Sequence, residues 1–166
     1  MRAVVTALLA TLAAVCLAAF PATAATYELG SPAIAQVTLP DAWSPTVTER
    51  GVEATSADDE IYVAVRPAAI ENAEDAVKQT LAYLVGQGVR IDVSTQRQQA
   101  AQINGMDAVS LAYSGKDEDD ENIEISVSVF IISPSAAVIL TYWGSKEGEQ
   151  TYAAELRGIL QSLTRK

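Results

Sequence analysis

The most chemically distinctive stretch of this sequence is a run of five adjacent carboxylates, Asp117 to Glu121, within the segment SGKDEDDENIEI. Carboxylate oxygens are the ligands that hard cations such as Ca²⁺ prefer. An EF-hand calcium loop, however, needs Gly at its sixth position and Glu at its twelfth. Counting from Asp117, these positions hold Asn122 and Ser128, so the run does not match that motif.

The candidates for a weak, partly hydrated cation site are Asp117, Asp119 and Asp120. Successive side chains in an extended segment point to opposite sides, so adjacent carboxylates do not converge on one ion. They also repel one another, and we expect no basic residue beside them except Lys116. We therefore interpret the run as a solvated hairpin tip and assign no metal and no cofactor. A cation site is the alternative.

The residue types that several reaction classes need are missing. The chain has no histidine, and its single cysteine, Cys16, lies in the N-terminal segment. Beyond that segment, a thiolate nucleophile, a Ser-His-Asp triad or a Cys/His zinc site cannot form. Carboxylate-based hydrolysis would need two carboxyl groups placed across a cleft, which sequence alone does not show. We assign no catalytic residues and expect that the protein is not an enzyme.

Residues 1–24 have the features of a secretory signal peptide. Arg2 supplies a positive start, residues 3–20 form an apolar core, and Pro21 precedes the small-residue site ATA at 22–24. One alternative is an uncleaved membrane anchor, because the apolar run is long enough to cross a bilayer. Lipid attachment at Cys16 is another, although Val15 stands where lipoprotein signals favour a small residue. Cleavage predicts a protein that is periplasmic or secreted.

The remaining residues, 25–166, are expected to form a single domain, because they contain no Pro/Ser/Gly-rich linker and no internal repeat. Removal of Arg2 with the leader changes the formal net charge from -10 to -11. Such an acidic surface repels phosphate backbones and anionic lipid headgroups alike. We therefore expect no nucleic-acid partner. We also expect no membrane insertion after cleavage, because no segment after the leader resembles a membrane span.

Apolar residues that alternate with a period of two predict a sheet. The predicted strands are 33–40, a shorter one at 48–56, 60–67, 89–96, 106–114, 122–133 and 136–144. Asn104 and Gly105 form a strong hairpin turn. Consecutive strands joined by short turns run antiparallel, because a parallel return needs a crossover of about a dozen residues. Residues 122–133 become apolar on both faces in their second half, which predicts a sheet covered on both sides.

Two segments have the period of an amphipathic helix. In residues 71–88 one side carries Ala73, Ala76, Val77, Thr80, Leu81 and Leu84. Ser145 caps a closing helix whose buried stripe is Tyr152, Leu156, Ile159, Leu160 and Leu163. The predicted fold class is therefore α+β, with an antiparallel sheet flanked by two main helices.

Several short motifs follow one another in a familiar order: LPDAW at 39–43, the INGMDA turn at 103–108, LTYWGSKE at 140–147 and the closing ILQSL at 159–163. Together with the leader, this order resembles the PsbP-like and DcrB-like group of small exported α/β proteins. The resemblance implies an α/β/α sandwich and accessory or binding roles rather than catalysis, and it supplies no catalytic residues. Trp43 and Trp143 are expected to be core residues, because each buries a large area.

Two functions from different classes remain open. The first is a non-enzymatic envelope protein that binds or helps to assemble another protein. The alternative is a carrier of a small molecule or lipid, because the strand AAVILTYWG at 136–144 could line a pocket between sheet and helix.

We expect the mature protein to begin near Ala25 and to be soluble after export, because the leader ends in an A-x-A site. N-terminal sequencing and intact mass of the protein isolated from its native cells check this expectation. Recovery of the intact chain, with residues 1–24, from the membrane fraction would contradict it.

Overall fold

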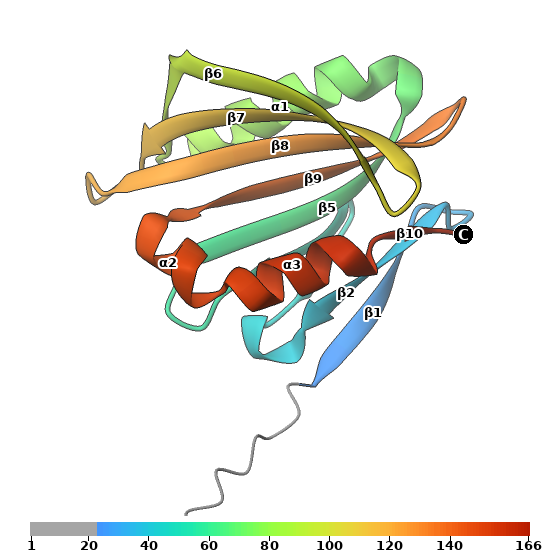
Figure 1. The fold of residues 1–166 in the computed structure, drawn as a ribbon, viewed down its shortest axis with the longest axis horizontal. Coiled ribbons are helices and arrows are strands. Elements are labelled where there is room, and N and C mark those ends of the chain that lie inside the picture. Colours follow the sequence, from blue (N-terminus) through green and yellow to red (C-terminus); the bar gives the residue numbers. More distant parts are fainter. Residues whose placement is uncertain (1–22) are drawn as a thin grey trace, which may run out of the picture.

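Figure 1 shows the fold as a computed structural model that describes residues 23–166. The predicted leader, residues 1–24, lies outside the described residues except for its last two, so the cleavage site stays a prediction. The described region is an α+β domain in which a large antiparallel sheet lies between helices. This arrangement confirms the predicted fold class.

The main sheet has seven strands in the order β3-β4-β5-β9-β8-β7-β6. All neighbouring strands run antiparallel, as the short turns predicted. In sheet order the strands are Thr46–Thr48, Gly51–Thr55, Ile61–Ala69, Ala136–Ser145, Asn122–Ser133, Met106–Lys116 and Arg90–Ile103.

The single short strand predicted at 48–56 is instead a hairpin of β3 and β4 that turns just before Gly51. Gly51 has a φ of 148°, and a Cβ at this position would come within 2.1 Å of the carbonyl oxygen of Val65. Only glycine allows β4 to approach β5 this closely.

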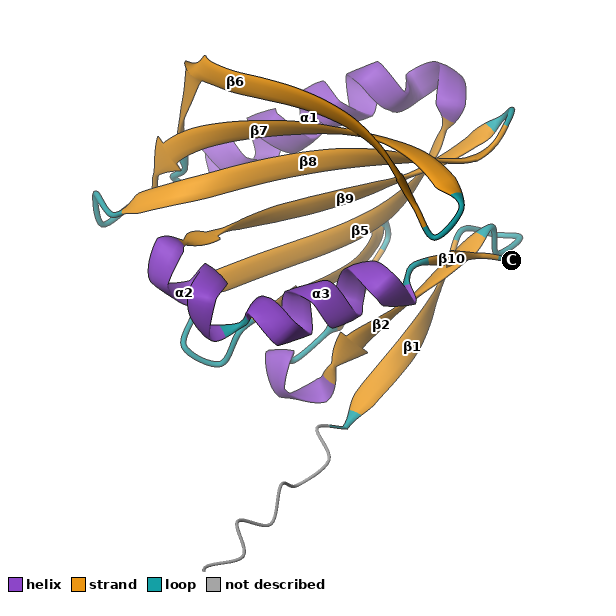
Figure 2. Cartoon of the chain, viewed as in Figure 1, coloured by secondary structure: helices purple, strands orange, loops and turns teal. Residues whose placement is uncertain are grey.

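Helices cover both faces of the main sheet (Figure 2). Helix α1, Ala73–Gly86, packs on one face through Val77 and Leu84. Helices α2, Lys146–Thr151, and α3, Ala153–Ser162, lie on the other face. Two 3-10 turns, η1 at Asp41–Trp43 and η2 at Ile70–Asn72, precede β3 and α1. None of the helices described here has both the length and the unbroken apolar character that crossing a bilayer demands.

The closing helix begins as predicted but is broken in the middle. The hydroxyl of Ser145 accepts a hydrogen bond from the backbone N–H of Gly148 at 2.9 Å, which confirms the predicted cap. The predicted continuous helix is interrupted at Tyr152, whose φ of -102° and ψ of 18° separate α2 from α3. The ring of Tyr152 packs edge-on against Trp43 at 5.4 Å, and Trp43 is a core residue as expected.

A second, smaller sheet was not predicted. It consists of β1, Ala24–Leu29, β2, Ala35–Pro40, and β10, Thr164–Arg165, in the order β1-β2-β10. The predicted strand at 33–40 therefore exists, but it does not join the main sheet. Its alternate side chains, Ala35, Val37 and Leu39, are fully buried in the core that α3 also enters. Burial of one face therefore determines where β2 lies, while its hydrogen-bonding partners come from both ends of the chain.

The hairpin of β6 and β7 is fastened to the end of α3 by Asn104. Asn104 and Gly105 have φ values of 52° and 71°, which fits the predicted two-residue turn. The Asn104 side-chain amide also donates hydrogen bonds to the carbonyl oxygens of Leu160, Gln161 and Leu163, at 3.0, 3.2 and 2.8 Å. The first two carbonyls belong to the last turn of α3 and the third to Leu163, which follows the helix, so they lack partners within it. One side chain thus shapes a turn and caps a distant helix.

Asn104→Ala is expected to destabilise the protein by about 2–4 kcal/mol, because it removes the capping hydrogen bonds and because alanine tolerates the positive φ less well than asparagine does. Glycine adopts the positive φ without strain, so Asn104→Gly removes only the cap and should lower the free energy of unfolding by about 1–2 kcal/mol. Urea unfolding monitored by circular dichroism measures both. A glycine variant as stable as the wild type would show that the cap contributes nothing.

Candidate functional site

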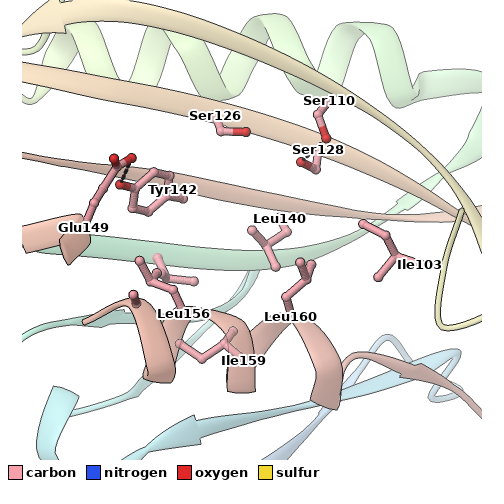
Figure 3. A pocket seen from close by; sticks show the side chains of 12 residues that line it. Ile103, Ser110, Ser126, Ser128, Leu140, Tyr142, Glu149, Leu156, Ile159 and Leu160 are labelled. Carbon is pink, nitrogen blue, oxygen red and sulfur yellow. Dashed lines mark hydrogen bonds between the residues drawn. The ribbon is translucent and has the colours of Figure 1, made fainter. Parts of the chain in front are cut away.

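A cleft of about 470 Å³ opens between the main sheet and α3. The volume lies within the range of about 300–1,000 Å³ that is usual for small-molecule sites. Figure 3 shows that β8 and β9 form one side of the cleft and α3 the other. The cleft therefore occupies the position, between sheet and helix, that the carrier hypothesis requires.

The apolar part of the lining combines sheet and helix. Leu140 projects from β9, and Ile103 lies at the end of β6 (Figure 3). The remaining apolar side chains are Val63, Leu156, Ile159 and Leu160, with Ala153 at the start of α3. Leu156, Ile159 and Leu160 were predicted as the buried stripe of the closing helix. They do pack on the core, but Leu156 and Leu160 stay only partly buried, since the cleft leaves part of their surface uncovered.

A wall of hydroxyl groups faces this apolar part. Ser126 and Ser128 on β8 and Ser110 on β7 all line the cleft (Figure 3). Ser110 and Ser128 are direct cross-strand neighbours, and their hydroxyls are hydrogen bonded at 2.7 Å. Strand alternation predicted that Ser126 and Ser128 lie on the face opposite to Ile125 and Val127. No feature of the sequence indicated that this face borders a cleft.

One end of the cleft is acidic. The hydroxyl of Tyr142 donates a hydrogen bond to Oε1 of Glu149 on α2 (Figure 3). Burial and, to a smaller extent, this hydrogen bond raise the pKa of Tyr142 well above its usual range, so the phenol remains a neutral donor. Glu149 was not among the site residues expected from the sequence. The one feature of the sequence that could have indicated it is its position in the first turn after the Ser145 cap. From there its side chain reaches back to Tyr142 on β9.

The arrangement is suited to binding more than to acid-base chemistry. Among the residues that line the cleft, Glu149 is the only carboxylate, whereas glycoside hydrolysis needs a pair. The lining otherwise offers hydroxyls and aliphatic side chains, which orient and bury a ligand.

The acidic run lies at the tip of the hairpin of β7 and β8, where Lys116 pairs with Asn122. The carboxylate of Asp117 accepts hydrogen bonds from the backbone N–H groups of Asp119 and Glu121, at 3.0 and 2.9 Å. The tip is therefore an ordered turn that satisfies its own backbone.

The prediction that Lys116 is the only basic neighbour was wrong. The guanidinium of Arg90, at the start of β6, contacts the carboxylate of Asp120 and donates to the carbonyl oxygen of Asp117 at 3.2 Å. Arg90 is far away in sequence but pairs with Lys116 across the ladder. Only strand pairing brings this positive charge to the tip.

A second acidic loop approaches the tip. Asp58, Asp59 and Glu60 share a hollow of about 240 Å³ with four carboxylates of the acidic run. Trp143 also lines this hollow and stacks on Tyr62 at 6.2 Å, so it is a half-buried residue rather than the core residue expected. Within residues 23–166, no three potential ligands are placed to hold a metal ion. Of the three candidate ligands, Asp117 accepts hydrogen bonds from the backbone of the turn, and Asp120 contacts Arg90. The solvated tip stays a prediction.

The fold resembles those of solved structures of low sequence identity. No protein-family model and no curated protein matches the sequence. The solution structure of the cyanobacterial PsbP from Synechocystis matches with a TM-score of 0.56 at 11% identity, over 91% of this chain and 97% of that one. The crystal structure of LpqN, involved in cell envelope biogenesis of Mycobacterium tuberculosis, matches with a TM-score of 0.49 at 12% identity, over 90% and 87%. The first match confirms a PsbP-like fold.

Calcium is expected to change the melting temperature of the wild type no more than an equal ionic strength of NaCl does. The variant with Asp117→Asn, Asp119→Asn and Asp120→Asn should stay within about 1 kcal/mol of the wild type, because an exposed pair such as Arg90 with Asp120 contributes little. Thermal unfolding of both proteins during a calcium titration tests this. A saturable stabilisation of the wild type alone would establish a cation site at the tip.

Proposed function

We propose that this protein is a non-enzymatic, exported binding protein that holds a small, largely apolar ligand in the cleft between the main sheet and α3. The observation that carries the proposal is the cleft itself, about 470 Å³ in volume, with an apolar floor and a wall of hydroxyls. Each methylene group that a ligand buries against the partly buried leucines of the cleft contributes about 0.8 kcal/mol to the binding free energy.

The PsbP-like fold supports a binding role, because the family resemblance implies accessory functions rather than catalysis. The residue types support it as well: the chain has no histidine, and its only cysteine is in the predicted leader. Export is supported by the features of residues 1–24 and would place the binding activity in the periplasm or outside the cell.

Wild-type protein is expected to bind N-phenyl-1-naphthylamine, a neutral apolar fluorophore, saturably and at one site. Ala153→Trp should weaken this binding at least tenfold, because Ala153 lines the cleft and is exposed, so that an indole fills the space without entering the core. The matched control is Ala154→Trp, which adds the same side chain one position later, outside the cleft lining. Fluorescence titration measures all three proteins, with melting temperatures as the folding check.

Equal binding by the two tryptophan variants would refute the cleft as the site. For the natural ligand, mass spectrometry of protein purified from its native compartment under non-denaturing conditions should reveal a retained small molecule.

A protein partner is the second candidate, and the convergence of the loops at 58–60 and 117–121 favours it. Their carboxylates concentrate the negative charge of the molecule beside Trp143, a surface suited to a basic partner. In the same purification, a co-purifying chain released by moderate salt would support this accessory role, whereas a retained small molecule supports the carrier.

A further inference from the structure

We propose that the ligand of the cleft is a cationic amphiphile, an alkyl chain that carries an amine or a quaternary ammonium group, with its positive charge held by Glu149. This inference rests on the proposed binding function and specifies the chemical class of the ligand. It follows from the charge, the polarity and the size of the cleft.

The charge of the lining excludes the more common amphiphiles. Of the residues that line the cleft, Glu149 alone is charged, and none is Lys or Arg. A fatty acid or a phospholipid headgroup would therefore enter without a counter-ion and would meet a carboxylate of like sign. Removing a charge from water without a partner is costly, whereas a cation would gain one.

A guanidinium on the cleft side of the sheet, that of Arg97, does not change the balance. Arg97 pairs with Ala112, which pairs in turn with Ser126, so Arg97 lies on the cleft side of β6. Its Nη2 is 2.7 Å from Oε2 of Glu124, and the other oxygen of that carboxylate, Oε1, accepts a hydrogen bond from the Ser114 hydroxyl at 3.0 Å. The positive charge of Arg97 is thus already neutralised by a neighbour.

The polar groups are placed for a ligand with one charged end. Glu149 and Tyr142 lie at one end of the cleft and Ile103 at the other (Figure 3). The hydrogen bond from Tyr142 uses Oε1 of Glu149, which leaves Oε2 for a cationic group. Because its pKa is raised, Tyr142 stays protonated and keeps the carboxylate oriented. An alkyl chain extending from this end would run between Leu140 and the leucines of α3.

The size of the cleft sets the length of the chain. A volume of 470 Å³ holds roughly 15 non-hydrogen atoms at about 30 Å³ each, the share that a water molecule occupies in the liquid. A chain of about eight to twelve carbons with a small headgroup fits this space, and a two-chain lipid does not.

Isothermal titration calorimetry with octylammonium, octanol and octanoate, all below the concentrations at which they form micelles, tests the proposal on the wild-type protein. These probes share one chain and differ in headgroup charge. We expect octylammonium to bind about tenfold more tightly than octanol, and octanoate to bind more weakly than octanol. The headgroup preference, rather than the absolute affinity, is the quantity that the inference predicts.

Glu149→Gln should remove the tenfold preference for octylammonium and leave octanol binding unchanged. Glu149→Lys should reverse the order, so that octanoate binds more tightly than octylammonium, a result that a misfolded protein could not give. The matched control is Glu147→Gln, which makes the same change in net charge on α2 at an exposed position outside the cleft lining. It should retain the wild-type preference.

Two results would overturn the inference: equal affinities of the wild type for octylammonium and octanol, or the same effect from Glu147→Gln as from Glu149→Gln. The second would mean that the acidic surface as a whole attracts the amine. Failure of all three probes to bind would instead refute the proposed function. Octanol binding without a charge preference would refute only the assignment of the ligand class.

Discussion

The burial of β9 on both faces is the constraint on which the rest of the structure depends. Side chains alternate along a strand, so Ile139 packs under α1 while Val138 packs on the α3 side, and neither is more than 1% exposed. The same alternation places Leu140 and Tyr142 on the α3 side, where they line the cleft. The strand that joins the two halves of the core therefore also supplies the floor of the candidate site.

The opposite wall of the cleft is held in place from two directions. The Asn104 amide ties the C-terminal end of α3 to the hairpin of β6 and β7, and the backbone N–H of Thr38 in β2 donates to the hydroxyl of Ser162 at 2.8 Å. Because α3 is fixed to both sheets, contacts within the protein itself hold the wall of the cleft in place. A preformed site avoids part of the entropy loss that binding would otherwise incur.

Charge is distributed unevenly over the molecule. The loops at 58–60 and 117–121 bring carboxylates together at one end of the main sheet, while the cleft contains a single carboxylate among hydroxyls and aliphatic side chains. An isolated charge beside apolar surface interacts more strongly with a ligand than one of many in water, since the local dielectric is lower. In the proposed binding role, Glu149 would for this reason distinguish ligands by their charge better than the more conspicuous acidic run would.

The sequence by itself determined the features that depend on local periodicity. The turn at Asn104, the cap at Ser145, the strand 136–144 and the helix within 71–88 were all predictable, because alternation and the 3.6-residue period are properties of neighbouring residues. Tertiary structure decided the pairing of β2 with β10, the contact of Arg90 with Asp120, and the placing of Glu149 beside Tyr142 at the mouth of a cleft. The first two join segments that are distant in sequence. The third depends on where α2 turns away from β9, which no periodic pattern records.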